Sequence, residues 1–206
     1  MRRFGRLRRR GATREPLARV LIVCEGQVTE PHYFNQLRHL ERCPVALKLH
    51  GGAVPKTLVE MAVKMKKESG ARAGRKRDQN LRYDHVWCVF DVDAHPSIAD
   101  ALQQARDNGI CTAVSNPCFE LWALLHFQDQ TKSVTRQVVQ SLCRKHMPGY
   151  AKELPCEELI AKCEDAVARS TALVKWHSDR GTPGGNPSTT VHELVRLIRM
   201  QRAAWR

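Results

Sequence analysis

Apolar runs of strand length alternate with segments of helical spacing along the first two thirds of the chain. The strand-like runs are RVLIVCEG at 19–26, VALKLH at 45–50, HVWCVFDVD at 85–93 and ICTAVSN at 110–116. Continuous apolar runs of this length are typical of parallel strands that are buried on both faces. Because helical segments separate these strands, the sequence predicts an α/β fold with a mostly parallel sheet flanked by helices.

The intervening segments carry end signals of helices. Thr29 and Pro31 predict the start of a helix that runs to about residue 42. Thr57 and Glu60 predict a capping box for the helix LVEMAVKMKKE, and residues 69–82 are then interpreted as a polar basic loop. The remaining predicted helices lie at 97–109, 117–127, 133–146, 155–176 and 188–200.

These patterns divide the chain into three parts. We expect residues 1–17 to form a flexible basic arm, 18–130 an α/β domain, and 131–206 a helical C-terminal region that packs on the same core. No apolar run approaches the roughly 20 residues of a membrane helix, and the N-terminus lacks the apolar core of a secretory signal. None of the eight cysteines forms a CxxC pair. A reduced cytoplasmic protein without a membrane partner is therefore expected.

Positive charge is concentrated in two short segments. Of the formal net charge of +13, residues 1–19 contribute an excess of seven and residues 64–82 an excess of six. Such clusters are typical of contact with a polyanion, most often nucleic acid, although two solvated segments that keep the protein soluble are the alternative. The residues predicted to contact RNA or DNA are Arg8, Arg9, Arg10, Arg72, Arg75, Lys76 and Arg77.

Two of the predicted strands end in acidic residues. Glu25 and Gly26 end the first strand, and Asp91 and Asp93 end the strand HVWCVFDVD. Because the carboxyl ends of parallel strands meet at one edge of a sheet, we expect these three carboxylates to lie together. They would repel one another unless a cation neutralised them, and their hard oxygen atoms suit Mg²⁺ or Mn²⁺. Chance placement of acids at strand ends is the alternative.

Four sequence blocks carry a resemblance to a known family. LIVCEGQVTEPHYF, VWCVFDVD, SNPCFELWALLHF and NPSTTVHELV, between residues 21 and 195, resemble the RloB-like family. The order strand–Glu–Gly, then strand–Asp–x–Asp, is similar to the Toprim domain of topoisomerases, primases and OLD-type nucleases. The resemblance implies a Toprim-like nuclease of prokaryotic phage defence, often encoded beside an ATPase partner. It also implies that Glu25, Asp91 and Asp93 are the metal ligands.

Further residues are weaker candidates for the same site. Glu30 and Glu120 either supply a second metal site or stabilise the first turns of their helices. His95 is either a base, a phosphate contact or a loop histidine. Lys175 either stabilises the phosphate, as a lysine does in OLD-type sites, or has no role there. The polar residues interpreted as helix caps, with phosphate binding as the alternative, are Ser115, Asn116, Ser188, Thr189 and Thr190.

Two functions remain open from the sequence. The first is a Mg²⁺- or Mn²⁺-dependent nuclease in which Glu25 lies closest to the attacking water or the leaving group. The second is a non-catalytic, nucleic-acid-binding subunit of a defence complex. The presence of all three acids favours the first. Strand transfer and primer synthesis are not expected, because the chain supplies neither a separate tyrosine-bearing domain nor the Cys/His spacing of a zinc domain.

Overall fold

A five-stranded sheet forms the centre of the molecule, in the order β2–β1–β3–β4–β5. A computed structural model describes residues 17–49, 54–92, 98–150 and 153–204. The strands are β1 Val20–Cys24, β2 Val45–Leu49, β3 His85–Asp91, β4 Cys111–Asn116 and β5 Ser188–Thr189. The first four are parallel and β5 is antiparallel to β4, so the predicted α/β fold with a mostly parallel sheet is confirmed.

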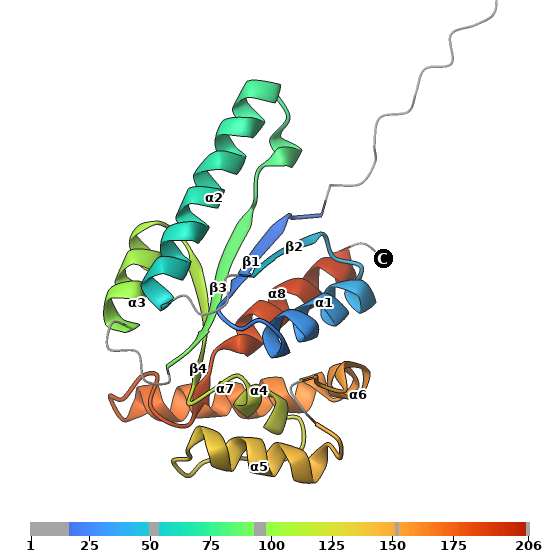
Figure 1. The fold of residues 1–206 in the computed structure, drawn as a ribbon, viewed down its shortest axis with the longest axis vertical. Helices are drawn as coiled ribbons and strands as arrows, with labels where there is room; N and C mark the ends of the chain where they lie inside the picture. The colour runs from blue at the N-terminus through green and yellow to red at the C-terminus, as the bar shows by residue number, and fades with distance from the viewer. Residues whose placement is uncertain (1–16, 50–53, 93–97, 151–152, 205–206) are drawn as a thin grey trace, which may run out of the picture.

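Helices cover both faces of the sheet (Figure 1). Those in the described residues are α1 Thr29–Glu41, α2 Pro55–Lys76, η1 Gln79–Leu81, α3 Ile98–Asp107, α4 Glu120–Leu124, α5 Arg136–His146, α6 Cys156–Ala161, α7 Cys163–Asp179 and α8 Val191–Ala204. On one face, Leu21 and Val23 pack with α2 and α3. On the other, Val20 and Ile22 pack with α1, α4 and α8, because successive side chains of a strand point to opposite faces.

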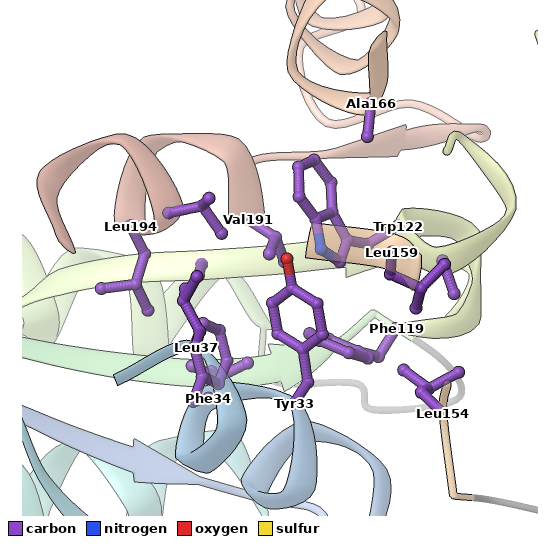
Figure 2. Packing of buried hydrophobic residues seen from close by; sticks show 14 of the residues in the cluster. Tyr33, Phe34, Leu37, Phe119, Trp122, Leu154, Leu159, Ala166, Val191 and Leu194 are labelled. Carbon is purple, nitrogen blue, oxygen red and sulfur yellow. The ribbon is translucent and has the colours of Figure 1, made fainter. Parts of the chain in front are cut away.

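The larger core is built around aromatic side chains of α1 and of the segment leading into α4 (Figure 2). The ring of Tyr33 lies edge-on to the rings of Phe34, Phe119 and Trp122, with centroid distances of 5.4, 5.8 and 6.4 Å. Leu194 of α8 belongs to the same cluster. The C-terminal helices thus complete the core that supports β1 and the site at its end.

The segment before α8 joins the sheet instead of starting a helix. β5 pairs with β4, and the hydroxyl groups of Ser115 and Thr189 lie 2.9 Å apart. The hydroxyl of Thr190 accepts the backbone N–H of Val114 at 2.9 Å. The predicted helix start at 188 is therefore wrong, and α8 begins at Val191. These polar residues tie two distant parts of the chain together, and the Thr189 hydroxyl also accepts the backbone N–H of Val191, the first residue of α8, at 3.3 Å.

Helix α2 is longer than its sequence pattern predicts. It begins at Pro55, with Val54 as the N-cap and no side-chain cap, so the expected capping box at Thr57 is wrong. The predicted loop over 69–82 is also wrong for residues 69–76, which are helical. Ala, Arg and Lys favour helix strongly enough to offset the two glycines of this stretch, and Ser69 and Ala73 are buried beside η1 and the start of β3.

Other predicted boundaries shift by a few residues. Val28 and not Thr29 is the N-cap of α1. The helix expected over 117–127 is α4 alone, with Phe119 as its N-cap, so Asn116 does not cap it and instead donates to the carbonyl of Gly184 at 2.9 Å. The helix expected over 155–176 is interrupted at Lys162 and forms α6 and α7. None of the helices in the described segments is long and apolar enough to cross a membrane.

Candidate active site

Glu25 and Asp91 meet at the carboxyl ends of the two central strands. Strands β1 and β3 are direct neighbours, with Cys24 opposite Val89. The backbone N–H of Glu25 donates to the carbonyl of Val89 at 3.0 Å, and that of Asp91 donates to a carboxylate oxygen of Glu25 at 3.4 Å. The expected proximity of these two acids is confirmed. Asp93 and His95 lie outside the described residues.

A pocket of about 320 Å³ opens at this edge. Its lining includes the carboxylates of Glu25, Glu30, Asp91 and Glu120. Arg136 is the one lysine or arginine in the described lining, so four ionised carboxylates would leave an excess of three negative charges. Such an excess in a confined space is unfavourable unless protons or cations offset it. The pocket is therefore suited to a cation or to the cationic side of a ligand.

Arg136 already supplies part of that positive charge. Its guanidinium donates to a carboxylate oxygen of Asp91 at 3.0 Å. The Asp91 side chain is 14% exposed and that of Arg136 is 38% exposed. Burial, followed by the carboxylate of Glu30, raises the pKa of Asp91 well above its usual range, and Arg136 opposes this rise. The charged form of Asp91 is thus disfavoured overall, despite its arginine partner.

Glu30 reaches the pocket from the first turn of α1. Its side chain is buried, and burial is the main reason that its pKa is raised. The nearby carboxylates of Glu120 and Glu25 raise the pKa further, while a hydrogen bond from the backbone lowers it. A helix N-terminus alone would lower the pKa of an acid, so burial, together with the neighbouring carboxylates, outweighs the helix dipole here. The first turn of α1 thus brings a third acid to the strand edge.

Glu120 is held in place by two polar side chains from another part of the chain. The Gln140 amide and the Tyr150 hydroxyl each donate to the same carboxylate oxygen of Glu120, both at 3.0 Å. Gln140 lies four residues after Arg136, so both project from one side of α5. Helix α5 therefore contributes a hydrogen bond to Glu120 and an ion pair to Asp91.

Sequence reasoning missed Arg136, Gln140 and Tyr150. The one local signal is Thr135, which caps α5 by accepting the backbone N–H of Val138 at 3.4 Å. The cap predicts a helix that has Arg136 and Gln140 on one side. It does not show that this side faces Asp91, which is 45 residues earlier in the chain. The packing of α5 against α4 brings Arg136 and Gln140 to the acids.

Other sequence-predicted residues lie elsewhere. Lys175 is exposed on α7, pairs with Asp179 at 2.8 Å, and does not line the acidic pocket. Arg72, Arg75, Lys76 and Arg77 are exposed at the C-terminal end of α2. Arg8, Arg9 and Arg10 are outside the described residues. The structure thus separates the predicted basic contacts of α2 from the acids by most of the length of the sheet.

The donor atoms of the pocket suit a hard divalent cation. Carboxylate oxygens are the ligands that Mg²⁺ and Mn²⁺ prefer. The guanidinium of Arg136 already places one positive charge beside Asp91. Within the described ranges, no three His, Cys, Asp or Glu side chains are already arranged as a metal site. Asp93, the third predicted ligand, is not among the residues in those ranges.

The comparison with protein families gives the chain its assignment. The family model described as "RloB-like protein" matches residues 20–198, from β1 into α8. The chain belongs to the RloB-like family. The matched stretch of this RloB-like protein contains Glu25, Asp91 and Arg136 as well as β5, whereas the arginine-rich first 17 residues lie outside it. No curated protein and no solved structure matches the chain.

Proposed function

We propose that this RloB-like protein is a Mg²⁺- or Mn²⁺-dependent nuclease with a Toprim-like catalytic core that hydrolyses phosphodiester bonds in RNA or DNA. The observation that supports this most is the contact between Glu25 and Asp91 at the carboxyl edge of the sheet, with Glu30 and Glu120 in the same pocket. Binding a divalent cation would offset the excess of negative charge there. A site at this edge is also the usual position for ligands in open α/β sheets.

Each residue has a proposed task in that reaction. Glu25, Asp91 and Asp93 would hold the cation, and Glu30 or Glu120 would hold a second one. When bound, the cation supplies polarisation of a phosphoryl oxygen and lowers the pKa of a bound water. Glu25 would accept the proton of the attacking water.

Helix α5 has a part in the same proposal. Arg136 would contact a non-bridging oxygen of the substrate phosphate, for which the planar guanidinium is well suited. Gln140 and Tyr150 would keep the carboxylate of Glu120 pointing into the pocket, as they already donate to it. The helix would thus position substrate and acid from one rigid element.

We also propose the setting that the family resemblance implies. The nuclease would act in phage defence, leading to abortive infection, together with an ATPase partner encoded beside it. The partner would control when the nuclease meets nucleic acid.

The direct test is cleavage by pure protein, alone and with the neighbouring ATPase. Labelled single-stranded RNA, folded RNA and duplex DNA are incubated with Mg²⁺, Mn²⁺ or EDTA, and the products are resolved by length. We expect cleavage of at least one substrate with metal and none with EDTA. Absence of metal-dependent products in every combination, with binding retained, would instead identify a non-catalytic nucleic-acid-binding subunit.

Gly26 offers a second test through its contact with Glu30. A Cβ at Gly26 would overlap the carboxylate of Glu30, which is the movable end of a side chain. Gly26→Ala should therefore push this carboxylate out of the pocket at a cost in unfolding free energy of about 1 kcal/mol, the low end of the usual range of about 1–3 kcal/mol for overpacking. We expect cleavage, and the rise in Tm on adding Mg²⁺, to fall. Kinetics and thermal unfolding with and without Mg²⁺ measure both effects.

Gly70→Ala is the matched control for this substitution. Nothing lies within 4 Å of a Cβ at Gly70, which is inside α2. Alanine there should raise the unfolding free energy by about 0.5–1 kcal/mol and leave cleavage unchanged. If Gly26→Ala behaved like Gly70→Ala in all three measurements, the position of Glu30 would have no bearing on the metal site.

A further inference from the structure

Helix α2 extends past the amino ends of the strands, away from the carboxyl ends of β1 and β3 (Figure 1). Near its start, the carbonyl of Leu58 lies 3.9 Å from the thiol of Cys88 in the middle of β3. Farther along, the Ser69 hydroxyl accepts the backbone N–H of Tyr83, two residues before β3 begins. The remaining residues of α2 therefore lie beyond the strand, on the side opposite to Asp91.

The part of α2 that extends past the sheet is strongly basic. Arg72, Arg75, Lys76 and Arg77 are all exposed, and we call these four residues the basic tip. Their neighbours include the small residues Ala71 and Gly74, the exposed acid Glu68 one helical turn before Arg72, and the half-buried Asp78 directly after Arg77. Cations in the last turn of a helix also stabilise its dipole, but that effect is confined to about one turn, and Arg72 lies before it. The tip thus presents more positive charge than helix capping requires.

The described chain also enters the fold at this end of the molecule. Arg19 donates through its backbone to Asp84 at 2.7 Å and through its guanidinium to the carbonyl of Asn80 at 2.8 Å. The chain therefore passes η1, directly after the basic tip, before it enters β1. Arg19 and the basic tip, about fifty residues apart in sequence, thus lie at the same end of the sheet.

The basic tip and the acidic pocket lie at opposite ends of the sheet. From His85 to Asp91, β3 covers about 20 Å at about 3.3 Å per residue. From Ser69 to Lys76, α2 adds about 10 Å in the opposite direction at about 1.5 Å per residue. One phosphate group cannot contact both places. A ligand that reaches both must extend over about 30 Å, close to the roughly 34–36 Å of one duplex turn.

We propose that the basic tip is a docking site for the backbone of double-helical nucleic acid, separate from the cleavage site. The part concerning cleavage rests on the proposed function. Exposed guanidinium and ammonium groups suit phosphates, whereas single strands are usually held by stacking of bases on aromatic rings. A duplex is stiff over about 50 nm, so it spans the two ends without an ordering cost. The substrate would be a duplex region that extends about one turn from the cleaved bond.

A charge-removal variant tests the docking without catalysis. Arg72, Arg75 and Lys76 are replaced together by Gln, which keeps helix propensity. The control replaces three exposed arginines elsewhere, Arg106, Arg180 and Arg196, by Gln. Binding of duplex RNA and duplex DNA of about 20 base pairs is measured in EDTA over a range of salt. For DNA, each lost phosphate contact should flatten the slope of log K against log salt by about 0.9.

The tip variant should bind either duplex at least about 10-fold more weakly at low salt, while the control binds like the wild type within about 2-fold. A tip variant with wild-type affinity and salt slope would overturn the docking site. Equal weakening for a single strand of the same length would overturn its restriction to duplexes. Because EDTA prevents metal-dependent cleavage, these outcomes do not depend on the proposed nuclease activity.

Cleavage then tests the span between the two ends. Hairpins with stems of about 6 and about 20 base pairs extend about 20 and 68 Å at about 3.4 Å per pair. With Mg²⁺, the wild type should cleave the long stem with at least about 10-fold higher kcat/KM, and the tip variant should lose that advantage. If the tip variant still cleaved the long stem faster than the short one, the claim that one duplex contacts both the basic tip and the acidic pocket would be overturned. If no protein cleaves either hairpin while the binding difference stands, the proposed function fails and the docking site remains.

Discussion

Replacing Asp91 by Asn should abolish cleavage and leave the protein at least as stable as the wild type. Loss of a group that only orients a metal ligand typically lowers metal affinity or activity by about 10–100-fold. Loss of the charge of a ligand itself should therefore reduce the cleavage rate at least about 100-fold. The pKa of Asp91 is raised by burial and by Glu30, which means that its ionisation works against folding. This cost is absent at low pH and develops as the pH rises from the unfolded to the folded pKa. The stability advantage of Asn should therefore increase above the usual aspartate range.

Asp165→Asn is the matched control for this prediction. Asp165 is an exposed acid in the first turn of α7, and its replacement makes the same change in charge and shape. Cleavage rates and thermal unfolding of the two variants and the wild type are compared between about pH 4 and pH 8. Full activity in Asp91→Asn would eliminate the proposed metal mechanism, because Asp91 is one of the proposed ligands. A large fall in Tm would show that its ion pair with Arg136 outweighs the repulsion among the acids.

Replacing Arg136 by Gln should destabilise the metal-free protein and increase its response to metal. Breaking a fully buried ion pair costs about 3–5 kcal/mol, and since the Arg136 side chain is 38% exposed we expect about 2–3 kcal/mol. Without the guanidinium, the repulsion among the four carboxylates is greater, so a bound cation stabilises the fold more. The rise in Tm on adding Mg²⁺ should therefore exceed that of the wild type, so that the two proteins differ less with metal than without it.

Arg144→Gln provides the comparison on the same helix. Arg144 is exposed near the end of α5, so its loss should change the metal-free Tm little. Thermal unfolding at several Mg²⁺ concentrations gives both the metal-free stability and the gain from metal. An Arg136→Gln variant with wild-type stability, or with an unchanged gain from Mg²⁺, would show that Arg136 and the metal do not compensate the same charges.

The features that the sequence predicts well are those set by neighbouring residues. The alternation of apolar runs and helical segments predicts the parallel sheet, since a strand buried on both faces is apolar along its whole length. Glu25 and Asp91 follow such strands directly, so their common edge can be inferred before any coordinates are known. Glu30 and Glu120 need one further step, the direction in which a helix leaves the sheet, and the structure brings both to the pocket.

The features that the sequence does not predict depend on contacts between distant residues. Gly70 and Gly74 suggest a loop, but Ser69 and Ala73 are buried beside η1, which keeps α2 helical to Lys76. Arg136 reaches Asp91 only because α5 packs on α4. The sequence of the end of α2 does not show that this segment packs beside η1. In the same way, the sequence does not show that Arg136, at the start of α5, meets Asp91.

The antiparallel pairing of β5 with β4 has a consequence for the newly made chain. The hydroxyl groups of Ser115 and Thr189 bind each other, and Val191 and Leu194 fill the core under β1. Until residues near 194 have left the ribosome, β4 has an open edge and the core behind Glu25 is incomplete. At about 5–20 residues per second the acids are synthesised several seconds before the fold that aligns them can close. A ribosome stalled before α8 has been translated would carry a nascent chain without an assembled site.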